Sequence, residues 1–327
     1  MIVVTGGAGF IGSNLVAELC ARGDAPVVVC DWMDAPEKSA NLGKHHVEAQ
    51  IEPGELWDWL DKNGNAVTAI FHMGASSSTV ETNVEFILDT NLDYSLRLWR
   101  WCAANDVRLI YASSAATYGD GAAGFVDDND PAALASLKPL NLYGWSKMAF
   151  DLNAVTLAAA GVHPPQWAGL KFFNVYGPNE YHKGGQRSLV AQLFQQISDS
   201  GGARLFRSHH PDYEDGGQLR DFVWVGDCVD IMLWLLDNPT VNGVYNVGTG
   251  QARSFADLAR ACFKAMGRTE TIDYIDTPTN IRAHYQYFTQ ADMTRLRAAG
   301  YATPPTTLED GVRRYIQDYL STNDAHR

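Results

Sequence analysis

A glycine-rich turn near the N-terminus constrains the fold of this chain more than any other feature. The apolar run MIVV is followed by TGGAGFIG, in which Gly6, Gly9 and Gly12 are three residues apart, and then by a helix-length segment. Glycines at this spacing permit a tight turn, close approach of the backbone to a pyrophosphate and close packing of helix on strand. The helix N-terminus adds unpaired N–H groups and a positive dipole. The segment therefore predicts the first strand, turn and helix of a dinucleotide-binding unit.

An acidic residue follows the second apolar run, PVVVCD. Asp31 stands where a carboxylate bonds a ribose hydroxyl of a bound dinucleotide, which by itself favours NAD. Lys38 could instead neutralise the 2′-phosphate of NADP, or it could be a solvated surface lysine. The residues alone leave the choice between the two cofactors open.

Short apolar runs alternate with helix-length segments through the first half of the chain. MIVV, PVVVCD, TAIFHMGA and VRLIYASS are rich in β-branched residues and bounded by Gly, Pro, Asp or Ser. This alternation predicts an α/β Rossmann fold with a doubly wound parallel sheet. The less regular second half predicts a smaller, interleaved C-terminal substrate domain. The expected division is a dinucleotide-binding domain over 1–172, about 221–252 and 286–308, and a nucleotide-sugar domain over 173–220, 253–285 and 309–327.

Composition and charge exclude several classes of protein. The net charge of −13 and the pI of about 5.0 predict no nucleic-acid partner and no anionic membrane surface as partner. The five cysteines contain no CxxC pair and fit a reducing compartment. The chain shows no basic signal-peptide region and no apolar run near the roughly 20 residues of a membrane span. We therefore expect a cytoplasmic protein. The pairs His45–His46 and His209–His210 lack partners at ligand spacing, so no metal site is expected.

A tyrosine–lysine pair follows the fourth apolar run. NLYGWSK places Tyr143 and Lys147 four residues apart, on one face of a helix. A lysine ammonium beside a phenol would lower the pKa of the phenol, and a tyrosinate could accept a hydroxyl proton. Ser114, at the end of YASS, could orient the substrate oxygen. These residues predict hydride-transfer chemistry at the carboxyl edge of the sheet.

The motifs TGGAGFIG, SSAATYG, YGWSK, NVYGP, RDFVWVGD and YNVGTG occur in this order along essentially the whole chain. Together they resemble the extended short-chain dehydrogenase/reductase family, which includes the nucleotide-sugar epimerases. The resemblance implies a Rossmann domain with a small nucleotide-sugar domain. It also implies that Tyr143 is the catalytic base, Lys147 its partner and Ser114 the oxygen-binding hydroxyl.

A narrower set of motifs, GASSST, FNVYGPNEYHKG and YFTQADMTRLRAAGY, resembles the branch of that family that inverts C6 of the heptose in an ADP-sugar. That branch passes through a 6-keto intermediate and supplies heptose for the lipopolysaccharide core. The resemblance implies tightly bound NADP, with NAD as the alternative. It also implies an ADP-sugar substrate and a homo-oligomer, with a pentamer as one form. Lys183 would be a second catalytic base, because a ketone that turns over in the site needs a proton donor for each orientation.

The same resemblance implies two sets of binding residues. Those expected around the cofactor are Gly6, Gly9, Phe10, Ile11, Gly12, Asp31, Trp32, Lys38, Met73, Gly74, Ala75, Ser76, Ser77, Asn91, Lys147, Val175 and Lys183. Those expected around the ADP-sugar are Ser114, Asn174, Gly185, Gln192, Phe206, Arg207, Ser208, His209, Arg220 and Tyr285.

Other functions are compatible with parts of this pattern. A nucleotide-sugar 4-epimerase or reductase could work with Tyr143 alone, and Lys183 could then pair with a phosphate. A 4,6-dehydratase would carry an Asp-Glu pair where this chain has Ala115 and Ala116, so elimination lacks its acid and base. A cofactor-binding regulator without catalysis would not need the set Ser114, Tyr143 and Lys147.

Overall fold

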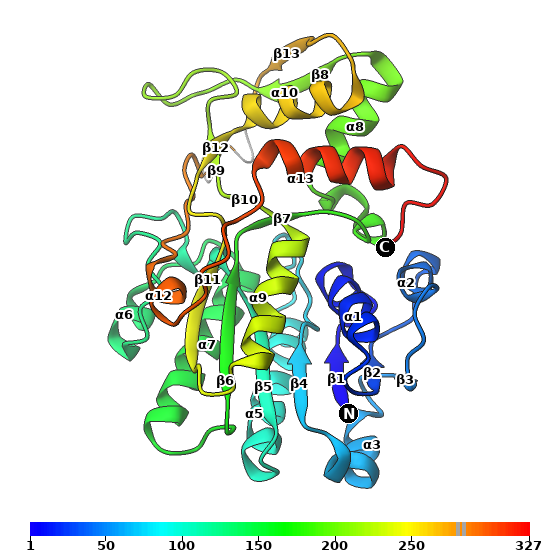
Figure 1. The fold of residues 1–327 in the computed structure, drawn as a ribbon. Coiled ribbons are helices and arrows are strands. Elements are labelled where there is room, and N and C mark those ends of the chain that lie inside the picture. The colour runs from blue at the N-terminus through cyan, green and yellow to red at the C-terminus, as the bar shows by residue number, and fades with distance from the viewer. Residues whose placement is uncertain (279–281, 283–285) are drawn as a thin grey trace.

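A seven-stranded parallel sheet forms the larger part of the molecule. The structure is a computed structural model that describes residues 1–278, 282 and 286–327. The strand order is β11-β6-β5-β4-β1-β2-β3, and every neighbouring pair is parallel (Figure 1). The strands are β1 Ile2–Thr5, β2 Val27–Cys30, β3 Ala49–Ile51, β4 Ala69–His72, β5 Arg108–Ser114, β6 Trp167–Phe172 and β11 Gly243–Val247. The order reverses between β1 and β4, so a crevice for ligands is expected at their carboxyl ends.

Helices cover both faces of the sheet. Figure 1 shows α1 Phe10–Arg22 and α9 Val225–Asp237 on one face, with α5 Tyr94–Ala104 and α7 Leu142–Ala159 on the other. Successive residues of a strand pack on opposite faces of the sheet. Val4 packs in the cluster beneath α1 and α9, and Val3 packs in the cluster with Trp99 and Phe150. Each fully buried side chain of this kind contributes about 1.5–3 kcal/mol. The strands are therefore mostly apolar, as the sequence pattern requires, with a few buried polar residues such as His72 of β4 and Lys171 of β6.

A second layer of elements lies above the carboxyl ends of the strands in Figure 1. The helices α8 Leu189–Ser200, α10 Phe255–Met266 and α13 Leu308–Tyr315 pack with the parallel pair β8 Ala203–Phe206 and β13 Ile272–Ile275 around an apolar cluster of their own. Two further pairs connect the layers: β7 Asn174–Tyr176 with β10 Phe222–Trp224, and β9 Leu219–Arg220 with β12 Arg253–Ser254.

The remaining elements are short and lie at the ends of the strands and helices. They are α2 Pro36–Leu42, α3 Leu56–Asn63, η1 Gly64–Ala66, α4 Val84–Ile87, η2 Leu88–Asp93, η3 Ala115–Tyr118, α6 Pro131–Ser136, η4 Tyr181–Gln186, α12 Thr294–Ala298 and η5 Ile316–Leu320.

The predicted α/β Rossmann fold is confirmed, together with the smaller C-terminal sheets. Among the elements that sequence periodicity did not indicate are β3, β8, β13 and α6, which are short. In the part of the chain that the structure describes, no helix has the length and apolar character to cross a membrane.

Candidate active site

The glycine turn after β1 is packed so closely that side chains are excluded from it. Gly6 has φ +66°, and a Cβ there would lie 2.5 Å from the backbone nitrogen of Gly74. A Cβ on Gly12 would lie 2.1 Å from the carbonyl oxygen of Gly6. Gly9 precedes α1 as its N-cap residue without a side-chain hydrogen bond, so the first N–H groups of the helix face an open turn. This cradle fits the pyrophosphate of a dinucleotide.

The carboxyl end of β2 holds an acid and a lysine side by side. Asp31 is buried, and its Oδ2 accepts a hydrogen bond of 2.9 Å from the Ala8 N–H. Lys38 Nζ lies 3.3 Å from Asp31 Oδ1 and 2.9 Å from Asp34 Oδ1, and it donates to the Trp32 carbonyl at 3.0 Å. The Trp32 side chain is 46% exposed. Lys38 is therefore no freely solvated surface lysine, and it brings a positive charge to the ribose end of the site.

A cavity of about 1260 Å³ runs along the carboxyl edge of the sheet. It brings together most of the side chains and turns predicted for the cofactor, because β1, β2, β4 and β5 all end at this edge. The predicted cofactor residues that line it are Gly6, Gly9, Phe10, Ile11, Gly12, Asp31, Trp32, Lys38, Met73, Gly74, Ala75, Ser77, Lys147, Val175 and Lys183. The predicted substrate residues that line it are Ser114, Asn174, Gly185 and Gln192.

Two predicted cofactor residues, Ser76 and Asn91, are not among the lining residues. The Asn91 side chain is buried, accepts from the Ser76 N–H at 2.8 Å and donates to the Ser76 carbonyl at 2.9 Å. It also donates to Ser146 Oγ at 3.0 Å, on the helix that carries Tyr143. Asn91 thus holds the loop after β4 against α7 rather than facing the cavity.

Tyr143, Lys147 and Ser114 meet at the sheet edge. Lys147 Nζ donates to the Ala112 carbonyl at 2.8 Å, and burial lowers the pKa of Lys147 to about 8. Burial raises the pKa of Tyr143, and a hydrogen bond with Ser114 opposes that rise. Burial of the phenol is therefore the largest effect on the Tyr143 pKa, and the expected lowering of that pKa by Lys147 stays a prediction. Ser114 is within hydrogen-bonding reach of the phenol, as an oxygen-orienting residue must be.

Lys183 enters the same cavity from the loop that contains η4. Its Nζ lies 4.9 Å from the centre of the Phe10 ring, and burial lowers its pKa, with an opposing effect from Glu180. Glu180 fixes the loop: its carboxylate accepts 2.5 Å and 2.9 Å hydrogen bonds from the hydroxyls of Ser188 and Tyr315. Asn179, with φ +72°, donates to Ser13 Oγ at 3.0 Å. The lysine is therefore presented by a loop that is fastened to both layers of the molecule.

Five further predicted substrate residues are not among those that line the cavity, namely Phe206, Arg207, Ser208, His209 and Arg220. Arg207 donates to the Tyr274 carbonyl at 3.1 Å, and the Ser208 and His209 N–H groups donate to Asp215 and Tyr287. Arg220 is buried and lies 5.5 Å from the centre of the Phe255 ring, which itself faces the cavity. Phe206 ends β8, which pairs with β13. Their expected contacts with an ADP-sugar remain predictions, and Tyr285 lies outside the described residues.

Among the cavity residues that the sequence reasoning missed are His182, Arg187 and His72. His182 and Arg187 lie near Lys183 in the η4 loop. The Nδ1 atom of His182 is buried and has no hydrogen-bond partner among the described residues, so a ligand atom could meet it. His72, also in the lining, is buried between Thr5 and Ser95, and burial lowers its pKa to about 3. The sequence signal for the first two was the HKG motif, which contains His182 and ends three residues before Arg187. Among the described residues, no group of three or more His, Cys, Asp or Glu side chains is arranged to hold a metal ion.

Comparisons with known proteins agree with this geometry. Residues 2–248 match the model of the NAD dependent epimerase/dehydratase family. The chain is 49% identical to the ADP-L-glycero-D-manno-heptose-6-epimerase of Nitratidesulfovibrio vulgaris strain DP4, with 99% of each chain covered. It is 43% identical to the enzyme of that name from Fusobacterium nucleatum, with 100% of each chain covered.

Solved structures give the same answer at the level of the fold. The ADP-L-glycero-D-manno-heptose-6-epimerase of Helicobacter pylori has a TM-score of 0.79 at 29% identity and covers 97% of this chain and 95% of its own. The UDP-glucose 4-epimerase of Thermus thermophilus, in complex with NAD, has a TM-score of 0.72 at 25% identity, with 95% and 96% covered. The family predicted from the motifs is confirmed: the chain belongs to the NAD dependent epimerase/dehydratase family.

Proposed function

We propose that this protein is an ADP-heptose 6-epimerase that converts ADP-D-glycero-D-manno-heptose to ADP-L-glycero-D-manno-heptose. The observation that carries the proposal is that two side chains able to exchange a proton, Tyr143 of α7 and Lys183 of η4, line one cavity from different elements. The full-length relatives of the same name support the choice of substrate.

The mechanism follows from what each side chain can do with the C6 hydroxyl. The glycine turn, Asp31 and Lys38 would hold a nicotinamide cofactor, which would supply the acceptor and donor of the C6 hydride. Tyr143 takes the hydroxyl proton in one orientation of the sugar, while Ser114 holds the oxygen and Lys147 favours the tyrosinate. Once C6 is a planar ketone it can present its other face, and its oxygen then points elsewhere in the cavity. Lys183 supplies the proton for that orientation.

NADP is the proposed cofactor, with NAD as the alternative. The support is the position of Lys38, whose ammonium sits 3.3 Å from Asp31 and offsets the carboxylate that would repel a 2′-phosphate. Lys38 is 16% exposed, so its attraction for a phosphate is only partly screened.

The proposal includes a cytoplasmic homo-oligomer, with the pentamer as one form, and the domain division given above. Separate apolar clusters beneath the sheet helices and around α8, α10 and α13 support the division. All five cysteines are free thiols, in keeping with a reducing compartment.

The decisive experiment is conversion of ADP-D-glycero-D-manno-heptose by the NADP-loaded protein, followed at C6 by NMR in deuterated water. We expect interconversion of the two epimers with no deuterium at C6, because the hydride stays within one site. UDP-glucose and UDP-galactose are the control substrates. Interconversion of these two with no action on ADP-heptose would identify a 4-epimerase instead. Deuterium at C6 would rule out direct oxidation of that carbon.

A further inference from the structure

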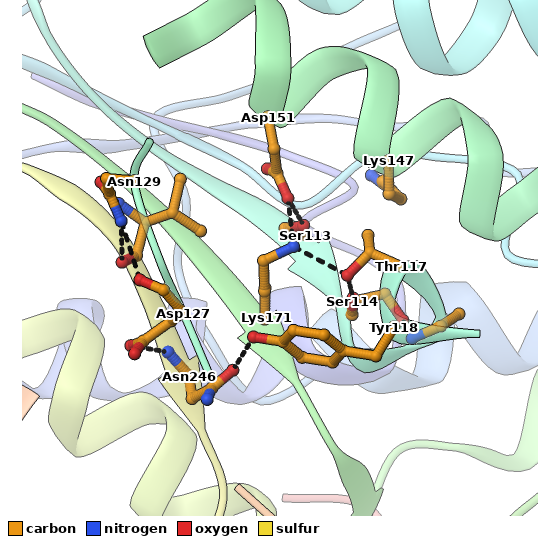
Figure 2. Close-up of polar contacts among 12 residues, drawn as sticks. Ser113, Ser114, Thr117, Tyr118, Asp127, Asn129, Lys147, Asp151, Lys171 and Asn246 are labelled. Atoms are coloured by element: carbon orange, nitrogen blue, oxygen red, sulfur yellow. Dashed lines mark hydrogen bonds and ion pairs between the residues drawn. The ribbon is translucent and has the colours of Figure 1, made fainter. Parts of the chain in front are cut away.

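A buried ion pair lies behind the cavity wall that carries Ser114, Tyr143 and Lys147. Asp151 of α7 and Lys171 of β6 are both 0% exposed, and Lys171 Nζ lies 2.7 Å from Asp151 Oδ2. Neither residue is among those that line the cavity. Figure 2 shows the two side chains meeting, with Lys147 on the same helix as Asp151.

The pair is tied to the turn that presents Ser114. Asp151 Oδ2 accepts a hydrogen bond of 2.6 Å from Ser113 Oγ, and Lys171 Nζ donates to Thr117 Oγ1 at 2.7 Å. The Thr117 hydroxyl in turn donates to the Ser114 carbonyl at 2.8 Å. Ser114 is therefore held from the residue before it and through its own carbonyl (Figure 2).

The pair also acts on the catalytic helix through its charge. Tyr143, Lys147 and Asp151 are four residues apart along α7 and so share one face. The Asp151 carboxylate adds to the rise that burial causes in the pKa of Tyr143, and it raises the pKa of Lys147 against the larger lowering by burial. The Lys171 ammonium, at 2.7 Å, offsets that carboxylate.

Stability alone is a weak reason to keep such a pair. Taking two charges out of water costs about as much as their attraction returns, and a well-packed apolar pair is often as stable. We propose that Asp151 and Lys171 form a positioning pair for the active site: they fix the turn from Ser113 to Thr117, and the charge of Lys171 shields the Tyr143 hydroxyl from the charge of Asp151.

Other ionisable groups face the same region and must stay unchanged in a test. They are Tyr111 on β5, whose hydroxyl donates to Asp151 Oδ1 at 3.1 Å, Tyr118 on η3, whose ring centre lies 5.0 Å from Lys171 Nζ, Lys147 on α7, His72 on β4, and His182, Lys183 and Arg187 on the η4 loop. Asp31 and Lys38 lie after β2, at the ribose end of the cavity, and balance one another there. The variants below alter only residues 151 and 171.

The inference rests on the proposed function, because it takes Tyr143 as the acid–base residue. The test therefore measures ionisation of Tyr143 directly, by NMR of ring-labelled tyrosine with Tyr143→Phe to assign the signal, beside the pH dependence of epimerisation. A parent protein without epimerase activity would contradict the proposed function, and the tyrosine titration would still decide the inference.

Charge-removing variants should move the titration in opposite directions. Lys171→Met leaves Asp151 unopposed, so less tyrosinate forms at a given pH and the titration moves up, on the order of one pH unit. Asp151→Asn leaves Lys171 unopposed, and the titration moves down. The double variant removes both charges and should return it toward the parent. Arg22→Met, which breaks the distant pair with Asp237, is the matched control and should leave the Tyr143 titration unchanged.

Variants that keep each charge test the positions of the two side chains separately from their charges. They also give a test that does not depend on how well the charge-removing variants fold. Lys171→Arg and Asp151→Glu should leave the tyrosine titration near that of the parent but lower turnover about tenfold, because the hydrogen bonds to Thr117 and Ser113 shift. An unchanged titration in both Lys171→Met and Asp151→Asn, or a shift in the same direction in both, would overturn the inference. Unchanged turnover in both charge-keeping variants would overturn its positional half.

Discussion

Single side chains decide how the proposed epimerase moves protons at C6. Tyr143→Phe and Lys183→Met should each lower turnover of ADP-heptose by about 10² to 10⁴, the usual effect of losing a positioned acid or base. The double variant should be little worse than either single one, since epimerisation needs both orientations of the ketone. The dissociation constant of NADP should stay nearly unchanged. If the Lys183→Met variant epimerises ADP-heptose at the parent rate, the second base is a different residue.

Lys38 sets the cofactor preference at the same scale. NADP should bind about ten- to a hundredfold more tightly than NAD, the difference made by one charge-assisted contact. Lys38→Ala should remove most of that preference by weakening NADP binding, because Asp31 would then face the 2′-phosphate without its 3.3 Å partner. Fluorescence titration with NADP and with NAD measures this preference. Lys44→Ala, on the outer surface, is the control. Equal dissociation constants in the parent protein would refute the preference.

The sequence predicted residues whose role depends on local pattern and missed those whose role depends on distant contacts. Gly6, Gly12 and Asp31 lie next to strands that their own neighbours specify, so the cofactor end of the cavity was predictable. Asp151 and Lys171 meet only in the folded chain, where β6 lies beside α7. No periodicity of the sequence predicts that contact. The assignment of Phe206 to His209 to the sugar rested on the family resemblance, and these residues are not among those that line the cavity.

Among the elements, the η4 loop depends most on contacts from elsewhere in the chain. Tyr315 of α13 donates to Glu180 at 2.9 Å, and Glu180 is buried. Tyr315→Phe should cost about 1 kcal/mol of unfolding free energy and also lower turnover severalfold, since the loop that carries Lys183 loses an anchor. Tyr245→Phe is the matched control, because it loses a 2.8 Å bond to the Asn242 carbonyl. Urea unfolding and kcat measure both effects. Equal turnover in the two variants would show that the anchor does not serve Lys183.

At the scale of the whole molecule, the cavity joins the two layers. Its lining includes Thr5 and His72 from the sheet and Phe222 and Leu258 from the second apolar cluster. A dinucleotide bound there should therefore stabilise both layers together. At a hundred times its dissociation constant, NADP should add about 2.7 kcal/mol to the free energy of unfolding and keep a single thermal transition. Gly12→Ala should lose this increment, since its Cβ would meet the Gly6 carbonyl oxygen at 2.1 Å. Two thermal transitions in calorimetry, only one of which NADP shifts, would contradict this coupling of the two layers.

The buried pair of Asp151 and Lys171 also limits how this sequence can drift in evolution. Losing one partner leaves an uncompensated buried charge and costs about 3–5 kcal/mol, a large part of the 5–15 kcal/mol that holds a typical protein folded. A lineage that altered either position alone would pass through a much less stable ancestor. We therefore expect the two positions to change together or not at all, although 19 residues of intervening chain separate them.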